Sequence, residues 1–198
     1  MKIIKSTRTA IQTAAQIVEN GGVVVYPTDT VYGLGCNPFK EDAVKRIFKI
    51  KGERNKPLPI LASGIGEIEK IAQIPEKARE LAKRFWPGPL TMVLPKKPSL
   101  PNIVTLNLNS VAVRVPNHDI ALALIRLSGG LLVGTSANKS GRKPPRTALE
   151  ATDQIGEEVD LILDAGQTPI GESSTILDLT GEKPRILRHG PIKIDDVF

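Results

Sequence analysis

Aromatic residues, cysteine and histidine are all scarce in this chain of 198 residues. Phe, Trp and Tyr make up 4% of it, Cys36 is the single cysteine, and His118 and His189 are the two histidines. One cysteine cannot form an internal disulfide or a cysteine-rich zinc site, so Cys36 is expected to be a small buried apolar residue. The histidines lack the spacing of a zinc site and are expected to lie at the surface or to cap a helix. The few aromatics disfavour the base-stacking platforms that read single-stranded RNA.

Long apolar runs are also missing. No stretch approaches the roughly 20 residues that a membrane-spanning helix requires, and the first ten residues lack the apolar core of a signal peptide. These features predict a cytoplasmic protein. With 40% hydrophobic residues, a chain of this length can bury about 70% of the surface that its unfolded form exposes. Residues 1–198 are therefore expected to form a single domain.

Positive charge is in excess. There are 27 Lys and Arg residues against 21 Asp and Glu residues, which gives a formal net charge of +6. A basic chain suits anionic partners such as nucleotides or RNA, although a soluble basic surface without a partner would have the same composition.

Hydrophobic periodicity alternates between helix and strand along the chain. Apolar residues at helical spacing predict five helices. One covers residues 6–20, one starts at about residue 41, one starts at residue 75, one ends at residue 127, and one covers residues 147–155. Short apolar runs predict strands over 23–26, 57–62, 90–94, 111–115, 131–134, 161–164, 174–179 and 185–188. We expect Ser6 or Thr7 to cap the first helix, and Asn117 or Asp119 to cap the helix that ends at Leu127. The pattern predicts an α/β fold, an open twisted mixed sheet flanked by helices, with ligands bound at strand ends.

Several familiar catalytic motifs are excluded. Gly129 and Gly134 have the spacing of a phosphate-binding Walker loop, but Thr135 stands where its lysine is needed. Ser136 and Lys139 match a Ser-x-x-Lys motif without the further elements of penicillin-recognising enzymes, and no Gly-x-Ser-x-Gly elbow occurs. What remains is a set of loops rich in Ser, Thr, Asn, Lys and Arg. Such loops suit nucleotidyl transfer, in which cationic groups and correct alignment of anionic reactants lower the barrier.

Seven motifs occur together in the order typical of one family. Four are the most specific: YPTDTVYGLG (26–35), KIKGERNKPLPIL (49–61), SVAVRVPNH (110–118) and GTSANKSG (134–141). With WPGPLT (86–91), ESSTILDL (172–179) and ILRHG (186–190), they resemble the YrdC/TsaC family of threonylcarbamoyl-adenylate synthases. One such motif arises by chance, whereas seven in order do not. The chain resembles the short form of the family, without the C-terminal extension domain.

The resemblance implies an activity and its substrates. The amine of L-threonine would take up bicarbonate or CO2, and the resulting carbamate would attack the α-phosphate of ATP with loss of pyrophosphate. The threonylcarbamoyl-AMP would serve a separate transferase, which modifies the adenosine beside the anticodon of tRNAs that read codons beginning with A. Mg2+ is expected to enter with ATP, and no metal site made by the protein is expected.

The resemblance also implies a catalytic tetrad. Lys51, Ser136 and Asn138 match its lysine and its Ser-x-Asn pair, and Arg54 is the nearest candidate for its arginine. The spacing around Arg54 departs from the family, because Glu53 is inserted before it. Either the loop brings Arg54 to the usual place or another cation replaces it.

Further residues match substrate-binding positions of the family. The positions that contact L-threonine correspond to Thr28, Arg114, Ser136 and Ser174. The positions that contact ATP correspond to Lys51, Ser110, Asn138, Arg146 and Arg188. Five of these residues also have a purely structural alternative: Thr28 as a turn residue, Arg114 as a surface charge, Ser174 as an outward-facing strand serine, and Lys51 and Arg146 as solvated loop cations.

Two other functions are compatible with the pattern. A protein of the same fold could bind double-stranded RNA or tRNA without synthase activity, as the basic charge would allow. A related carbamoyl-transfer enzyme of hydrogenase maturation is less compatible, because those proteins carry cysteine-rich zinc fingers and this chain has one cysteine.

Overall fold

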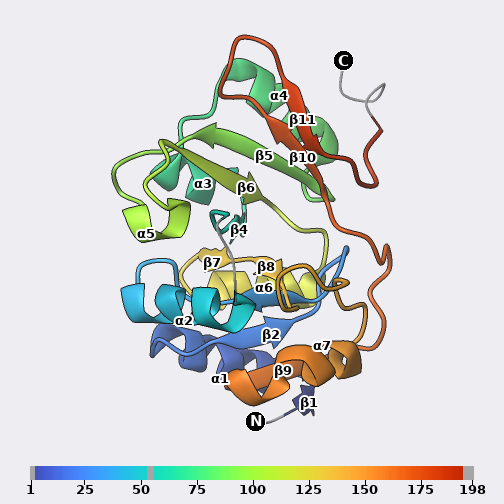
Figure 1. Cartoon of the computed structure of the whole chain (residues 1–198). Helices are drawn as coiled ribbons and strands as arrows, with labels where there is room; N and C mark the ends of the chain where they lie inside the picture. Colours follow the sequence, from blue (N-terminus) through green and yellow to red (C-terminus); the bar gives the residue numbers. More distant parts are fainter. Residues whose placement is uncertain (1–2, 53–55, 194–198) are drawn as a thin grey trace.

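Two β-sheets lie one above the other in the computed structural model, which describes residues 3–52 and 56–193 (Figure 1). The lower sheet in this view has the order β1 (Ile3–Lys5), β9 (Leu161–Asp164), β2 (Val24–Tyr26), β3 (Gly33–Gly35) and β8 (Thr135–Ser136). The upper sheet has the order β11 (Arg185–Arg188), β10 (Thr175–Asp178), β5 (Leu90–Pro95), β6 (Ser110–Arg114), β4 (Ile60–Ala62) and β7 (Leu131–Val133). Both sheets contain parallel and antiparallel pairs. The predicted mixed α/β fold is confirmed, with its strands divided between two sheets.

Helices cover both faces of the lower sheet. On β2, Val24 and Tyr26 pack in a core cluster with α1 (Arg8–Glu19) and α6 (Asp119–Leu127). Val25 points to the opposite face and packs in the cluster that holds α2 (Glu41–Lys51) and α7 (Ala148–Ile155). Complete burial of such a side chain contributes roughly 1.5–3 kcal/mol. The all-apolar sequence of this strand therefore reflects burial on both faces.

Capping residues set where these helices begin. The side chain of Thr7 accepts a hydrogen bond from the backbone nitrogen of Ala10 at the start of α1, as predicted for this helix. Thr147 caps α7 in the same way. Helix α6 starts after His118 without a side-chain cap, so the capping role predicted for Asn117 or Asp119 is wrong.

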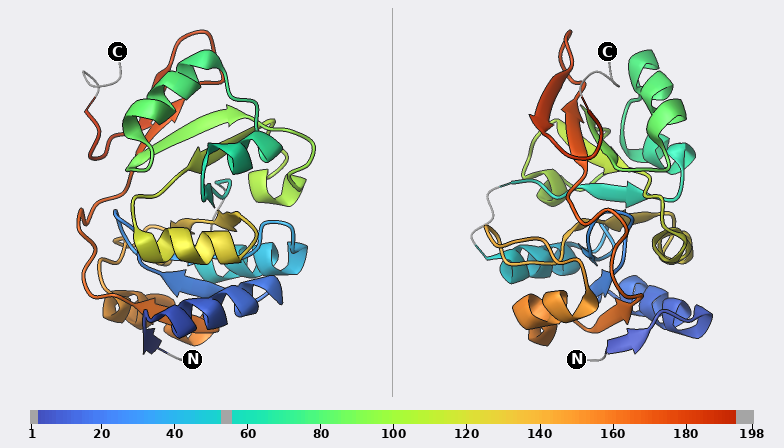
Figure 2. Two further views of the ribbon diagram at one scale, coloured as in Figure 1. Left: turned by 180° about the vertical axis from the view of Figure 1, so that it is seen from behind. Right: turned by 90° about the vertical axis from the view of Figure 1, so that its right-hand side faces the viewer.

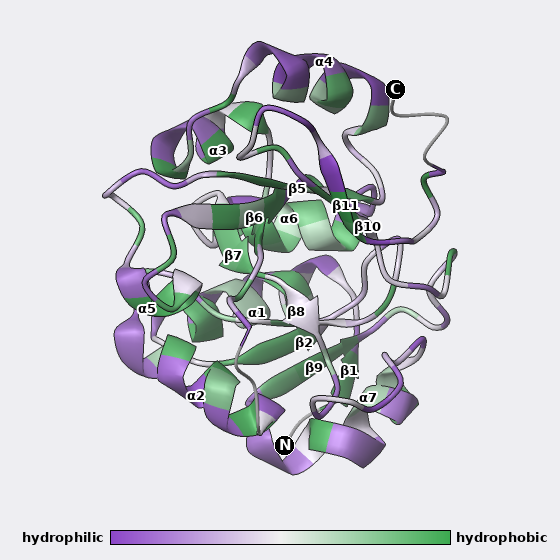
Figure 3. Ribbon diagram, turned by 45° about the horizontal axis from the view of Figure 1, so that its top comes forward, coloured by the Kyte–Doolittle hydropathy of each residue, from purple (hydrophilic) through white to green (hydrophobic). Residues whose placement is uncertain are grey.

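Two helices cover one face of the upper sheet, and α6 packs against Leu61 of β4 and Leu132 of β7 on the other face. Helices α3 (Ile65–Ile71) and α4 (Glu76–Phe85) bury apolar residues in the same cluster as Met92 and Leu94 of β5 (Figure 2). The hydrophilic residues of α4 point outward (Figure 3). Thr91 and Val93 alternate with the core residues of β5 and therefore face the other way, toward the lower sheet. A short helix, α5 (Asn102–Thr105), and the one-turn helix Gly156–Glu158 complete the elements.

One segment of chain belongs to both sheets. Strand β7 ends at Val133 in the upper sheet, and β8 begins at Thr135 in the lower sheet. Between them, the backbone nitrogen of Val133 donates to Cys36 and that of Gly134 donates to Pro59. The single predicted strand over 131–134 is thus continued by a second strand after Gly134, and the chain crosses between the sheets there.

Tyr26 explains the glycines of β3, a strand that is not among those predicted from the sequence. Its ring is fully buried over the strand, and its hydroxyl donates to the carbonyl of Val133 at 3.2 Å. A Cβ atom at Gly33 would lie 2.9 Å from this ring, and one at Gly35 would lie 2.6 Å from the carbonyl oxygen of Val133. Glycine is needed at both positions because another group approaches the backbone closely.

Replacing Gly35 by alanine is expected to lower the free energy of unfolding by about 1–3 kcal/mol, because the added methyl group overpacks a buried site. Urea unfolding measures the loss. Gly66→Ala is the matched control, since a Cβ at Gly66 in α3 has no atom within 4 Å and alanine is the better helix former. Equal stability of the Gly35→Ala variant and the unchanged protein would contradict the steric explanation.

Two other predictions can be compared with the structure. Cys36 is fully buried and unpaired, as expected, and burial raises the pKa of its thiol to about 12. Within residues 3–52 and 56–193, no helix has the length and apolar character needed to span a membrane.

Candidate functional site

A cleft of about 850 Å³ lies between the two sheets. Its upper wall comes from the face of the upper sheet that carries Thr91, Val93 and Ala112, and its lower wall comes from loops and strand ends of the lower sheet. The apolar part of the lining consists mainly of Leu61, Val93, Ala112, Ile176 and Leu187. The polar groups lie at two places, around Lys51 and around Arg114.

The loop after β2 forms part of the lower wall. The hydroxyl of Thr28 donates to the carbonyl of Val31 at 2.7 Å and accepts hydrogen bonds from the backbone nitrogens of Thr30 and Val31. This is the turn-stabilising use of threonine that the sequence left open as an alternative. Thr28 also lines the cleft, so its position is compatible with ligand contact.

Lys51 lies at the end of α2 with only 2% of its surface exposed. Its ammonium group donates to the carbonyl of Ser136 at 2.7 Å and to Oδ1 of Asn138 at 3.3 Å. The amide nitrogen of Asn138 donates to the carbonyls of Lys139 and Arg142, which fixes the orientation of this side chain. The buried ammonium is therefore held at the cleft by groups that follow β8.

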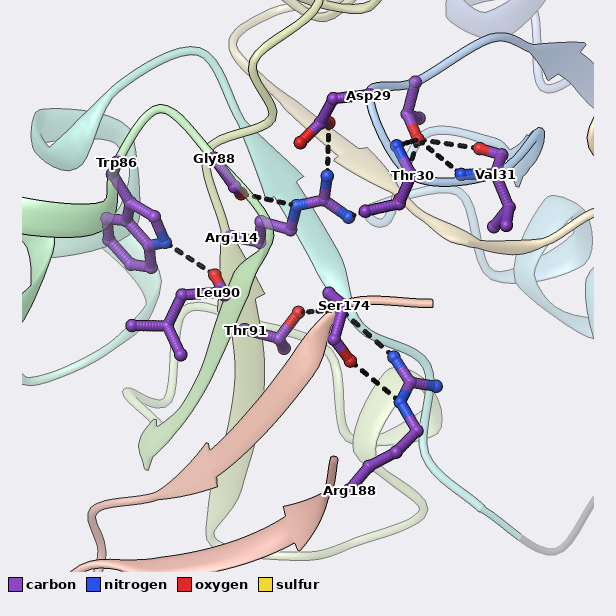
Figure 4. A network of polar contacts seen from close by, with 11 residues as sticks. Asp29, Thr30, Val31, Trp86, Gly88, Leu90, Thr91, Arg114, Ser174 and Arg188 are labelled. Carbon is purple, nitrogen blue, oxygen red and sulfur yellow. Dashed lines mark hydrogen bonds and ion pairs between the residues drawn. The ribbon is translucent and has the colours of Figure 1, made fainter. Parts of the chain in front are cut away.

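Arg114 ends β6 and is 5% exposed. Its Nε donates to the carbonyl of Gly88 at 2.9 Å, and Nη1 donates to the hydroxyl of Thr30 at 2.9 Å. Its Nη2 forms an ion pair with Oδ1 of Asp29 (Figure 4). These contacts join the upper sheet to the loop of the lower sheet and hold the guanidinium beside the cleft.

Ser174 and Arg188 form a second network on the upper sheet (Figure 4). Arg188 donates through Nε to the carbonyl of Ser174 at 2.9 Å and through Nη2 to its hydroxyl at 3.0 Å. The hydroxyls of Ser174 and Thr91 are 2.7 Å apart and share a hydrogen bond. This network fixes the Arg188 side chain, and all three residues line the cleft.

The two arginines act on each other electrostatically. Burial lowers the pKa of Arg114 from its ordinary value, and the Asp29 carboxylate opposes that shift. Burial also lowers the pKa of Arg188, and the charge of Arg114 lowers it further. A buried guanidinium whose charge a second guanidinium disfavours, where the one carboxylate pairs with the second, favours the binding of an anion.

The cleft brings together most of the residues that the sequence selected. Thr28, Lys51, Arg114, Ser136, Asn138, Ser174 and Arg188 all line it. Ser110 begins β6 opposite Pro95, four residues away from Arg114 along the strand, and is not among the lining residues. Arg146 lies behind the loop after β2, where its side chain approaches Gly171, and it too is outside the lining. Arg54 falls outside the described residues.

Asp29, Thr30 and Thr91 belong to the site although the sequence did not single them out. Asp29 and Thr30 stand in the same Pro-Thr-Asp-Thr turn as Thr28, and Thr91 closes the Trp-Pro-Gly-Pro-Leu-Thr motif. The signal that could have found Asp29 is a charged residue between the hydroxyl and apolar residues of this turn, because a buried carboxylate is rare without a partner.

A sequence model of the Sua5/YciO/YrdC family, described as Telomere recombination, matches residues 16–190. Threonylcarbamoyl-AMP synthase of Pyrococcus abyssi is 45% identical over 94% of this chain and 56% of its own length. The synthase of Bacillus subtilis is 42% identical over 94% of this chain and 55% of its own length. The chain thus spans about half the length of these curated relatives.

Solved structures agree with this relationship. P. abyssi Sua5 complexed with L-threonine has a TM-score of 0.94 at 43% identity, over 99% of this chain and 58% of that one. E. coli YciO has a TM-score of 0.89 at 27% identity, over 100% of this chain and 98% of that one. The chain belongs to the Sua5/YciO/YrdC family.

Proposed function

We propose that this chain is an L-threonylcarbamoyladenylate synthase, which makes threonylcarbamoyl-AMP and pyrophosphate from L-threonine, bicarbonate or CO2, and ATP. The relatives in P. abyssi and B. subtilis bear the name of this activity, and the P. abyssi structure was solved with L-threonine. One observation in this chain supports the proposal most strongly. Its cleft has cationic groups at two places, Lys51 at one and Arg114 with Arg188 at the other.

The two places suit two anionic groups of the reactants. Arg114 would bind the carboxylate of L-threonine, for which a planar guanidinium is well shaped, and Arg188 would contact the phosphates of ATP from the same part of the cleft. Ser174 and Thr28 would lie beside L-threonine. Lys51, Ser136 and Asn138 would hold the carbamate and the phosphates, where charge develops as the reaction proceeds.

The chemistry then follows in two steps. The neutral amine of threonine attacks the carbon of CO2 and loses a proton, which gives the carbamate. A carboxylate oxygen of the carbamate attacks the α-phosphorus of ATP, the bond to the bridging oxygen breaks, and pyrophosphate leaves. Lys51 reduces the repulsion between the anionic nucleophile and the phosphate. Ser110 and Arg146, which are not among the lining residues of the cleft, stay proposed ATP contacts, and Arg54 stays the proposed arginine of the catalytic tetrad.

Mg2+ would enter with ATP. The cleft offers hydroxyl and amide oxygens, and among its described lining residues there is no carboxylate. Mg2+ is commonly held by substrate phosphates and water with few protein ligands, so this donor set fits a metal bound mainly by the nucleotide. The ion would neutralise phosphate charge.

The product would be consumed by a separate transferase that modifies the adenosine beside the anticodon in tRNAs reading codons that begin with A. We propose that the chain acts in the cytoplasm as one domain. The excess of basic residues supports an alternative function, the binding of double-stranded RNA or tRNA without synthase activity.

Pyrophosphate release by the purified protein tests the proposal. With ATP, Mg2+, bicarbonate and L-threonine, we expect release together with a product of the mass of threonylcarbamoyl-AMP, and we expect background release when threonine or bicarbonate is omitted. A folded protein that releases no pyrophosphate would contradict the synthase proposal. If that protein bound duplex RNA with steep salt dependence and no sequence preference, the RNA-binding alternative would replace it.

A further inference from the structure

Asp29 is a buried carboxylate that does not line the cleft. It is 4% exposed, and its Oδ1 accepts the ion-pairing hydrogen bond from Nη2 of Arg114. Its neighbour Thr30 accepts from Nη1 of the same arginine. Asp29 therefore stands behind Arg114 as seen from the cleft, and its contact with a ligand there would be indirect.

Stability alone does not explain this ion pair. Oδ2 of Asp29 is buried and has no hydrogen-bond partner among the described residues, which leaves half of the carboxylate unsatisfied. A buried pair of charges loses hydration, and well-packed apolar residues in its place are often as stabilising or more so. An ion pair in which one carboxylate oxygen has no hydrogen-bond partner contributes even less stability. The burial of Asp29 beside Arg114 therefore needs another explanation.

The position of Arg188 supplies that explanation. Arg188 lies on the other side of Arg114 from Asp29 (Figure 4), so two positive charges face each other there; burial lowers the pKa of Arg188, and the charge of Arg114 lowers it further. Without Asp29, the Arg114 side chain would be driven away from Arg188 and out of its buried position. The carboxylate thus keeps Arg114 beside Arg188 at the cleft before any ligand arrives.

Arg114 is also restrained in orientation. The carbonyl of Gly88, the hydroxyl of Thr30 and the carboxylate of Asp29 each take one N–H group. A guanidinium has five N–H groups. The described residues accept hydrogen bonds from three of them, so two N–H groups are left for a ligand. Three fixed acceptors leave the planar group little freedom to rotate, and a side chain ordered beforehand loses less entropy on binding.

From these contacts we infer that Asp29 is a positioning residue, which holds the Arg114 guanidinium ready for the carboxylate of an amino-acid substrate. The inference rests on the proposed function, because it assigns the carboxylate of L-threonine to Arg114. Asp29 itself does not touch the substrate. Its effect should therefore depend on whether the ligand has a carboxylate.

Calorimetric binding of two ligands tests this dependence. L-threonine carries the carboxylate, and L-threoninol has a hydroxymethyl group instead. Asp29→Asn is expected to weaken L-threonine binding by about 10- to 100-fold, the range for loss of a hydrogen bond to a charged group, and to leave threoninol and ATP binding unchanged. The matched control is Asp160→Asn, which breaks an Asp–Arg pair with Arg46 away from the cleft and should alter neither ligand.

The outcomes separate the two proposals. Failure of the unchanged protein to bind L-threonine would overturn the proposed function. Threonine binding that survives Asp29→Asn within about twofold, or an equal loss for threonine and threoninol, would overturn the positioning role of Asp29.

If the Asp29→Asn variant does not fold, the Thr30→Val variant provides the test instead. That variant removes the neutral acceptor of Nη1, and it should weaken threonine about three- to tenfold without affecting threoninol; no selective loss would overturn the inference.

Discussion

Replacing Lys51 by methionine is expected to lower the rate of pyrophosphate release by about 10²- to 10³-fold, the range found when one preorganised donor is removed from an active site. The ammonium group is 2% exposed and contacts both Ser136 and Asn138, so no solvent cation can take its place. Methionine keeps most of the buried stem and should leave the fold unchanged. Initial rates at saturating ATP and threonine measure the effect.

Lys49→Met is the control for this prediction. Lys49 lies on the same helix two residues earlier and is exposed, so its loss should change the rate by less than about twofold, as for other exposed charges. A Lys51→Met variant with a rate within about threefold of the unchanged protein would show that this ammonium does not take part in catalysis.

Replacing Arg114 by glutamine is expected to lower the free energy of unfolding by about 3–5 kcal/mol, because Asp29 is then left as a buried charge without its partner. Urea unfolding gives the value. The double variant Asp29→Asn/Arg114→Gln should recover most of the loss, since it contains neither charge. This recovery is the sign of a coupled pair.

Arg126→Gln serves as the comparison for this second prediction. Arg126 is an exposed residue in the last turn of α6, and its replacement should change stability by less than about 0.5 kcal/mol. If Arg114→Gln were equally mild, or if the double variant were no more stable than the single one, Asp29 and Arg114 would not be energetically coupled.

Much of the fold could be predicted because it follows from local patterns. Helix α1 has apolar residues at helical spacing and a threonine cap, and β5 and β6 alternate buried and cleft-facing residues. Strand β3 could not be predicted, since Gly33 and Gly35 have low strand propensity and are required by the ring of Tyr26 and, at Gly35, by the carbonyl of Val133. The division into two sheets was missed for a similar reason. It depends on long-range pairing, and β4 pairs with both β6 and β7.

The candidate site shows the same limit. The family resemblance selected Lys51, Ser136 and Asn138, and the structure places Lys51 in contact with the other two although 85 residues separate it from Ser136. The contact between Asp29 and Arg114 also spans 85 residues, and no local pattern connects a turn aspartate with a strand arginine. For Ser110, closeness in the sequence was misleading. Ser110 and Arg114 belong to one motif, but four residues of strand at about 3.3 Å each place them about 13 Å apart.

The crossing at Gly134 has a consequence for the cooperativity of unfolding. The segment from β7 to β8 donates backbone hydrogen bonds to Cys36 and Pro59 and continues with one from Ala137 to Tyr32, so its order depends on both sheets at once. Loss of either sheet would leave buried donors and acceptors of this segment unpaired, which is unfavourable for the other sheet. The two walls of the cleft are therefore coupled in stability, and a local opening of one wall is opposed by the packing of both.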